Sequence, residues 1–369
     1  MKLENTDQKH GPHRWDRHHP HKEPRGGHPH GGMERRDAHR GDDLLKVEDL
    51  SVVYTAGKKI VRAVNGVSFE IKRGESLALV GESGCGKSTI AKAILRILPD
   101  RGAGISGGKI LFEGQDLATL PEKEMQHIRG DKISMVFQDP MTALNPTMRV
   151  GDQIADGIAL HDKLSKQEAE QKAMEILEMV GISRERYREY PHQFSGGMKQ
   201  RVVIAIALAC NPDLLLADEP TTALDVTIQA QVLDLINALK KKNNTAMLLI
   251  THDLGVVAET CDDVAVVYAG EIVESGSREE IFTNPMHPYL IGLFGSLPDM
   301  CEEGATRLKP IAGMMPNPSN LPSGCKFHLR CHYATEACKA GAVELADLGG
   351  THKCRCLNID AVRAGKEAK

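Results

Sequence analysis

Apolar and polar residues alternate in two stretches, Leu44 to Tyr54 and Ala63 to Ile71. A period of two is typical of β-strands that bury one face. The segment between them, Gly57-Lys58-Lys59, has the composition of a turn. We therefore predict two antiparallel strands joined by this turn.

Beyond Ile71, short apolar runs alternate with longer segments of helical periodicity. The run Ser76 to Val80 ends abruptly in glycines, as expected of a buried central strand, and Ser88 to Leu98 favours a helix. Further strands are predicted at Lys132–Phe137, Leu214–Ala217, Ala246–Thr251 and Val264–Tyr268. Strands that alternate with helices predict an α/β fold with a mixed or mostly parallel core sheet.

A helical insert interrupts this alternation between Phe137 and Ser195, and its segment Lys166 to Val180 is strongly amphipathic. From about Asn284 the sequence is rich in proline and cysteine with little periodicity, which predicts a small appended module. The predicted parts are a disordered tail over 1–43, a core domain over 44–283 with a helical subdomain at about 138–200, a cysteine-rich module over 284–357 and a flexible end over 358–369.

The N-terminal tail cannot bury enough apolar surface to fold, because histidine, proline, glycine and arginine dominate it. It holds eight of the 16 histidines: His10, His13, His18, His19, His21, His28, His30 and His39. Such a tract can bind Ni²⁺, Cu²⁺ or Zn²⁺, and it can equally be a solvated polar tail. It has no apolar core, so no signal peptide is predicted.

Composition adds two exclusions. The net charge of -4 does not suggest a nucleic-acid-binding protein, which is usually clearly basic. The longest apolar run, Val202 to Cys210, has about nine residues, whereas a membrane-spanning helix needs about 20. We therefore expect a cytosolic protein that reaches a membrane only through a partner.

One motif has the form of a phosphate-binding loop. Between a predicted strand and a predicted helix, the pattern G-x-x-x-x-G-K-[ST] is matched by Gly81-Glu82-Ser83-Gly84-Cys85-Gly86-Lys87-Ser88-Thr89. Glycines let several backbone N–H groups point at phosphate oxygens, and the helix N-terminus favours an anion. Lys87 can reach the β- and γ-phosphates of ATP, and Ser88 can coordinate Mg²⁺.

Two acidic residues follow the apolar run Leu214 to Ala217. They are Asp218 and Glu219, at the carboxyl end of a predicted strand, where ligands bind to open α/β sheets. Asp218 can hold Mg²⁺ through water, and Glu219 can polarise the attacking water. Together with the loop at Lys87, this pair predicts ATP hydrolysis.

A family resemblance follows from Phe194-Ser195-Gly196-Gly197-Met198-Lys199-Gln200-Arg201. This segment resembles the S-G-G-x-x-Q signature of ABC ATPases and lies 23 residues before Asp218, as in that family. A helix N-terminus with two glycines presents N–H groups to a phosphate. The resemblance implies that Ser195, Gly196 and Gly197 complete the nucleotide site of an opposite subunit.

Four further residues resemble family elements in the same order, and the resemblance covers about Leu44 to Gly276. Gln138 resembles the Q-loop glutamine that senses Mg²⁺ and water, and His252 resembles the switch histidine at the γ-phosphate. Asp225 resembles the D-loop aspartate, and Tyr54 the aromatic residue that stacks on adenine. The resemblance implies that Glu219 orients water while Lys87, Gln138 and His252 assist catalysis.

The implied fold is a P-loop ABC ATPase with a core sheet, an antiparallel β subdomain, a helical subdomain and a small cysteine-rich module. Two ATP molecules with Mg²⁺ would lie between this chain and a partner ATPase subunit. Two alternatives stay open: a soluble ABC-type ATPase of DNA repair or translation, and a metal-responsive nucleotide-binding regulator.

The C-terminal region narrows the resemblance to one branch of ABC transporters. Phe282-Thr283-Asn284-Pro285, His287-Pro288-Tyr289 and Gly324-Cys325-Lys326-Phe327-His328-Leu329-Arg330-Cys331 resemble the dipeptide/oligopeptide/nickel branch of ABC importers. This resemblance implies a second ATPase subunit (a paralogue or a second copy), two membrane permeases and an extracytoplasmic substrate-binding protein. It places the chain at the cytoplasmic face of the cell membrane, with peptides, nickel or metal chelates as cargo.

Four cysteines of the C-terminal module have the spacing C-x5-C-x6-C-x15-C: Cys325, Cys331, Cys338 and Cys354. Thiolates favour iron–sulfur clusters or zinc. The resemblance implies a [4Fe–4S] cluster, while zinc and free thiols stay open. Cys356 could replace Cys354; the resemblance favours Cys354, because the family cysteine follows a similar polar stretch.

Overall fold

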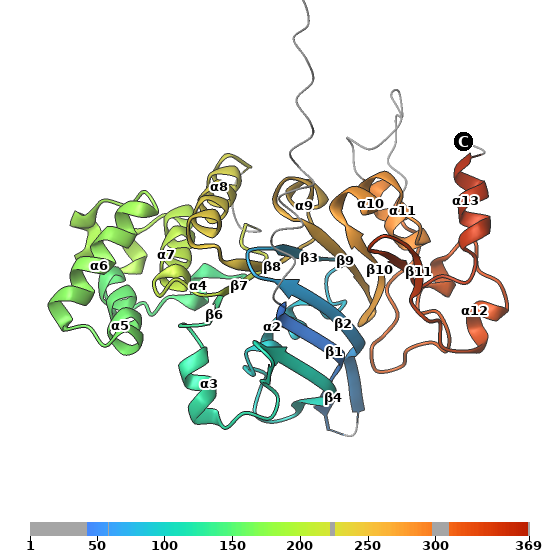
Figure 1. Ribbon diagram of the computed structural model, residues 1–369, viewed down its shortest axis with the longest axis horizontal. Coiled ribbons are helices and arrows are strands. Elements are labelled where there is room, and N and C mark those ends of the chain that lie inside the picture. The colour runs from blue at the N-terminus through green and yellow to red at the C-terminus, as the bar shows by residue number, and fades with distance from the viewer. Residues whose placement is uncertain (1–42, 58, 222–225, 297–309, 368–369) are drawn as a thin grey trace, which may run out of the picture. The chain divides into compact units, whose positions relative to one another are not determined.

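The computed structural model describes residues 43–57, 59–221, 226–296 and 310–367. Residues 1–42 of the tail predicted over 1–43 and the D-loop residue Asp225 lie outside this part of the chain, whereas Asp43 begins β1. The described strands form two sheets, one of four strands and one of eight. The ribbon shows the first sheet, with β1, β2 and β4, as a layer of its own beside the core sheet (Figure 1).

The four-stranded sheet is antiparallel and confirms the predicted strand pair. Its order is β2-β1-β4-β5, formed by β1 (Asp43–Ala56), β2 (Lys59–Lys72), β4 (Ala103–Phe112) and β5 (Gln115–Asp116). The sequence did not predict β4, because its stretch Ser106-Gly107-Gly108 interrupts the apolar alternation and is exposed.

The eight-stranded core sheet has the order β11-β12-β10-β9-β3-β8-β7-β6. Its strands are β3 (Ser76–Val80), β6 (Ile133–Val136), β7 (Leu214–Asp218), β8 (Ala246–Thr251), β9 (Asp263–Tyr268), β10 (Glu271–Ser277), β11 (Ala346–Gly349) and β12 (His352–Cys354). The run from β9 to β6 is parallel, and β10, β11 and β12 are antiparallel additions. The predicted α/β fold with a mixed core sheet is therefore confirmed.

Both faces of the core sheet are buried, because successive side chains of a strand point to opposite sides. In β3, Leu77 and Leu79 pack with the antiparallel sheet, whereas Ala78 and Val80 pack with the helical side. This double burial explains why these strands are continuous apolar runs in the sequence.

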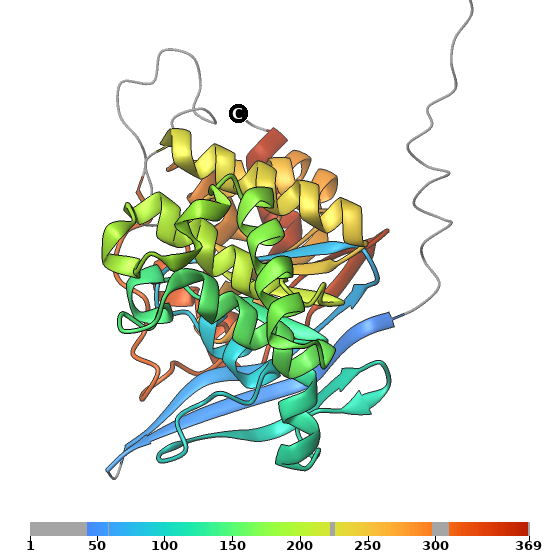
Figure 2. The same cartoon turned by 90° about the vertical axis from the view of Figure 1, so that its left-hand side faces the viewer.

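The helices before the final strands are α2 (Lys87–Ile94), α3 (Glu122–Ile128), α4 (Pro140–Ala143), α5 (Val150–Asp162), α6 (Lys166–Met179), η1 (Arg184–Arg188), η2 (Pro191–Gln193), α7 (Gly196–Leu208), α8 (Val226–Asn243) and α9 (Leu254–Thr260). The helices α5, α6 and α7 gather at one end of the core sheet, on the side of β6 and β7 (Figures 1 and 2). The helix α2 ends earlier than predicted, because Arg96 adopts a left-handed φ of 52°.

The C-terminal elements are α10 (Arg278–Thr283), α11 (Pro288–Phe294), η4 (His328–Arg330), α12 (Ala337–Ala340) and α13 (Ile359–Glu367). The predicted flexible end over 358–369 instead contains α13, whose Val362 is fully buried. Across the described ranges, no helix has the length and apolar character needed to cross a membrane.

Candidate nucleotide site

The loop between β3 and α2 depends on glycine for its path. Gly81 and Gly86 have positive φ angles of 153° and 110°. A Cβ atom would lie 2.2 Å from the Val267 carbonyl oxygen at Gly81 and 2.4 Å from that of Ala63 at Gly86. Because backbone atoms cannot move aside cheaply, both positions require glycine. The loop therefore leads directly into the N-terminus of α2, where N–H groups favour an anion.

Lys87 is held inside this loop. Its side chain is buried, and its Nζ donates to the carbonyl oxygens of Gly81 at 2.7 Å and Glu82 at 3.1 Å. A buried ammonium needs such acceptors. Phosphate oxygens are acceptors of the same kind, so the position suits a phosphate-binding lysine.

Two predicted Mg²⁺ ligands meet at the start of α2 and the end of β7. Ser88 Oγ donates to Asp218 Oδ1 at 2.8 Å. Burial raises the pKa of the Asp218 carboxyl, and the hydrogen bond from Ser88 opposes this shift. A hydroxyl and a carboxylate in contact are hard oxygen donors of the type that Mg²⁺ prefers. The residues therefore fit the predicted ion.

Glu219 is the centre of a second polar cluster. Gln138 Nε2 donates to Glu219 Oε2 at 3.1 Å, and His252 Nδ1 lies 3.6 Å from the same oxygen. The three residues follow the neighbouring parallel strands β6, β7 and β8, whose carboxyl ends meet at one edge of the sheet. Glu219 also has a left-handed φ of 46°, a conformation of the type that clusters at functional sites.

Tyr54 lies on β1 and is partly buried, and its hydroxyl is 3.4 Å from Thr89 Oγ1. The contact places this aromatic ring beside the first turn of α2. Stacking on adenine stays a prediction.

The signature segment begins a helix of the insert. Ser195 is the exposed N-cap of α7, and its Oγ accepts from Met198 N at 3.4 Å. A Cβ atom at Gly197 would lie 2.8 Å from Ile228 Cγ2, whereas Gly196 faces open space. Within the described ranges no hydrogen bond joins Ser195 to the loop at Lys87, and Ser195 and Gly196 are exposed at the start of α7.

The sequence does not reveal that two distant residues, Tyr289 and Arg330, hold the loop through Glu82. The backbone N–H of Glu82 donates to Tyr289 Oη at 2.8 Å, and the Glu82 carboxylate pairs with Arg330. Glu82 occupies a variable position of the loop motif, and Arg330 stood out only as the neighbour of Cys331. A pairing across 248 residues leaves no local pattern that could have revealed it.

The predicted cluster of cysteines receives no support from the structure. In the ranges described, no three His, Cys, Asp or Glu side chains are grouped to hold a metal ion. Cys325 N donates to the Cys338 carbonyl oxygen at 2.9 Å, but Cys354 is fully buried on β12, which pairs with β10. Burial raises the pKa of the Cys331 thiol to about 11.

Taken together, a glycine loop around a buried lysine, an Oγ–carboxylate pair and a Gln–Glu–His cluster at the end of parallel strands define an ATP-hydrolysing protein of the ABC class. A family model described as ABC transporter matches residues 64–222. A second model, described as oligopeptide/dipeptide transporter, C-terminal region, matches residues 273–338.

Curated relatives match most of the chain. The oligopeptide transport ATP-binding protein OppD of Bacillus subtilis (strain 168) is 53% identical over 293 residues, which cover 79% of this chain and 82% of OppD. The dipeptide transport ATP-binding protein DppD of the same organism is 52% identical over 292 residues, covering 79% of this chain and 87% of DppD.

A solved structure of MJ0796, a dimeric bacterial ABC transporter cassette, aligns with a TM-score of 0.58 and 29% identity over 64% of this chain and 99% of that chain. The chain therefore belongs to the ATP-binding proteins of the oligopeptide/dipeptide family of ABC transporters, and it is an ATPase.

Proposed function

We propose that this chain hydrolyses ATP to energise the import of peptides through membrane permeases. The observation that most supports ATP hydrolysis is the Gln138–Glu219–His252 cluster beside the Ser88–Asp218 pair. A protein that only sensed nucleotide would not need a carboxylate prepared for hydrolysis. The names of the relatives, which are oligopeptide and dipeptide transport ATP-binding proteins, support peptides as the cargo.

The chemistry is phosphoryl transfer to water. The loop N–H groups and Lys87 bind the phosphates of ATP, and Ser88 and Asp218 would hold Mg²⁺, which supplies positive charge at the β- and γ-phosphates when bound. Glu219 orients the water that attacks the γ-phosphorus. The bond from that phosphorus to the oxygen of ADP breaks, and ADP and phosphate leave. Gln138 and His252 position Glu219, which raises the fraction of time that it faces the water.

A second ATPase subunit completes the site in this proposal. Ser195 and Gly196 are exposed at the N-terminus of α7, where helical N–H groups favour an anion. The related cassette MJ0796 is described as dimeric, and one of its structures is described as bound to ADP and Pi. Ser195 of each subunit would then contact the γ-phosphate held by the other subunit's loop. Tyr54 would stack on the adenine of its own ATP, and Asp225 would contribute at the interface.

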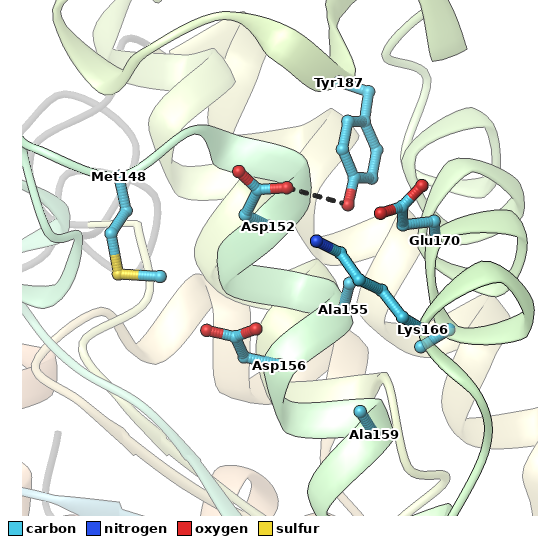
Figure 3. A pocket seen from close by; sticks show the side chains of 9 residues that line it. Met148, Asp152, Ala155, Asp156, Ala159, Lys166, Glu170 and Tyr187 are labelled. Carbon is cyan, nitrogen blue, oxygen red and sulfur yellow. Dashed lines mark hydrogen bonds between the residues drawn. The ribbon is translucent and has the colours of Figure 1, made fainter.

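The permeases have a candidate docking surface on the helical insert. A hollow of about 440 Å³ lies between α5 and α6. Figure 3 shows Asp152, Asp156 and Glu170 around it with a single basic residue, Lys166. Tyr187 donates a hydrogen bond to Asp152 at 3.0 Å and closes one wall.

Two large apolar side chains near this insert are also exposed. They are Phe137, at 39%, and Met141, at 62%, on either side of Gln138. The acidic hollow and these two exposed apolar side chains suit a permease segment with apolar and basic residues. Docking beside Gln138 would link the membrane subunits to the hydrolytic cluster and would hold the chain at the cytoplasmic face of the membrane.

Uptake by the assembled importer tests the proposal. The chain, its permeases and a second ATPase subunit are placed in vesicles with an extracytoplasmic binding protein, and uptake of labelled peptides and of Ni²⁺ is measured. We expect ATP-dependent peptide uptake that Glu219→Gln abolishes. Uptake of nickel without peptides, or peptide uptake that survives Glu219→Gln, would contradict it.

The iron–sulfur cluster is a separate proposal that rests on the cysteine spacing. The structure adds only that Cys325 N donates to the Cys338 carbonyl oxygen, and the described residues include no group of three side chains placed to hold a metal ion. Anaerobic purification with iron and sulfide analysis tests it. About four irons per chain, lost on Cys331→Ser, would support the cluster; zinc or no metal would refute it and leave the ATPase unaffected.

A further inference from the structure

The second residue of the phosphate-binding loop is held by the C-terminal part of the chain. We propose that Arg330 is a positioning residue for ATP binding, which fixes the loop by pairing with Glu82. This inference rests on the proposed function, because it takes the loop at Lys87 as the ATP site.

The pairing between the two side chains is bidentate. Arg330 Nη1 lies 2.9 Å from Glu82 Oε2, and Nη2 lies 2.9 Å from Oε1. Only 6% of the Arg330 side chain and 28% of the Glu82 side chain are exposed. Two parallel charge-assisted hydrogen bonds in such a sheltered place fix both position and orientation.

Arg330 is itself fixed by the C-terminal part of the chain and by β9 of the core sheet. Its Nε donates to the Ala312 carbonyl oxygen at 3.0 Å, and its Nη1 donates to Tyr268 Oη at 3.3 Å. The guanidinium carbon lies 5.8 Å from the ring centroids of both Tyr268 and Phe327. Glu82 is therefore paired with an arginine that other contacts hold in place, rather than with an exposed surface side chain.

The backbone of the same loop residue has a second anchor. Glu82 N donates at 2.8 Å to the hydroxyl of Tyr289, a fully buried residue of α11 whose ring lies 4.7 Å from that of Tyr268. The Glu82 carbonyl oxygen accepts from Lys87 Nζ at 3.1 Å. The residue that Arg330 holds thus also bears one of the groups that place the phosphate-binding lysine.

The charges of Glu82 and Arg330 should directly affect the binding of an anionic ligand such as ATP. Glu82 carries a negative charge within the loop that receives the triphosphate, and Arg330 neutralises it. Without Arg330, the carboxylate would be partly buried, unpaired and repulsive to phosphate. We therefore expect Arg330→Gln to weaken binding of MgATP about tenfold, the scale of a coupled charge pair. The rate at saturating ATP should change little, because Glu219 is untouched.

A double variant separates positioning from folding. Glu82→Gln combined with Arg330→Gln removes the unpaired charge, so it should bind MgATP more tightly than Arg330→Gln alone. Arg330→Lys should fall between the wild type and Arg330→Gln, because a lysine keeps the charge but cannot form the bidentate pair.

Arg355 offers a matched control in the same part of the chain. It is partly buried and donates to the carbonyl oxygens of Ile272, at 2.9 Å, and Val343, at 2.5 Å, neither of which belongs to the loop. Arg355→Gln should lower the melting temperature and leave the affinity for MgATP unchanged.

The experiment measures the dissociation constant of MgATP, by competition with trinitrophenyl-ATP, for the full chain and these variants, together with each melting temperature. An affinity of Arg330→Gln equal to that of the wild type or of Arg355→Gln would overturn the inference. Lys87→Ala distinguishes this failure from failure of the proposed function. If the wild type binds ATP and Lys87→Ala does not, the ATP site stands whatever Arg330 does.

Discussion

Replacing Glu219 by glutamine changes one carboxylate oxygen into an amide group and preserves the shape of the side chain. The side chain is buried, and its Oε2 accepts from Gln138 at 3.1 Å with His252 Nδ1 at 3.6 Å. A glutamine can present its amide oxygen to Gln138, so that contact can remain. The variant therefore removes the basic oxygen and the charge without creating a cavity.

The expected fall in kcat follows from the loss of the carboxylate that orients the attacking water. A positioned base contributes about 10²–10⁴-fold to a rate, which corresponds to roughly 3–5 kcal/mol of the barrier at about 1.36 kcal/mol per tenfold. We expect a fall in kcat of this size. The affinity for MgATP should be unchanged, because Lys87 and the Ser88–Asp218 pair are intact, and the free energy of unfolding should change by less than about 1 kcal/mol.

The assay compares steady-state phosphate release with nucleotide binding for the wild type, Glu219→Gln and Lys87→Ala. Lys87→Ala is the matched control because it should lose ATP binding, whereas Glu219→Gln should lose only hydrolysis. A Glu219→Gln variant that keeps kcat within about threefold of the wild type would refute the assignment of Glu219 as the group that orients water.

Three further substitutions, the first with Gly196→Ala as its control, test separate parts of the site. Gly86→Ala should destabilise the chain by about 1–3 kcal/mol in chemical denaturation, because of its positive φ and the Ala63 oxygen 2.4 Å from the new Cβ, whereas Gly196→Ala should be neutral for stability; equal stabilities would contradict this. Ser195→Ala should lose about 1 kcal/mol through its cap and abolish hydrolysis by the assembled importer while ATP binding by the single chain persists, and unimpaired hydrolysis would argue against a role at the opposite subunit. Burial raises the pKa of Asp218, so its ionised form is disfavoured in the folded state, and the metal-free chain should gain stability from this group as the pH falls through the raised pKa. Asp218→Asn should accordingly raise the melting temperature of the metal-free chain and remove the Mg²⁺ dependence of ATP binding; a lower melting temperature would show that the carboxylate is not a net cost to folding.

The parts of the fold that sequence predicted well are those with continuous local patterns. The strands β3 and β8 are fully buried apolar runs, and both were predicted at the bounds that the structure has, Ser76–Val80 and Ala246–Thr251. The end of α2 was not, because Arg96 takes a left-handed conformation that glycine usually adopts. The strands β11 and β12 are too short to show periodicity.

The same distinction holds within the site. Motifs that are contiguous in sequence placed Lys87 and Asp218 at the site, and the order of the neighbouring strands brings Gln138 and His252 to Glu219. The bond between Glu82 and Arg330 depends on how the C-terminal part of the chain lies against the loop. Such a long-range contact follows from tertiary packing and leaves no periodic pattern in the sequence.

The central claim is that hydrolysis by this chain powers peptide import. The most direct measurement is the rate of ATP hydrolysis by the importer reconstituted in vesicles, with and without its peptide-loaded binding protein. We predict that peptide stimulates hydrolysis and that Glu219→Gln removes both the basal and the stimulated rates. A rate of ATP hydrolysis that does not change when the permeases or peptide are left out would contradict this claim. A peptide-stimulated rate that survives Glu219→Gln would also contradict it.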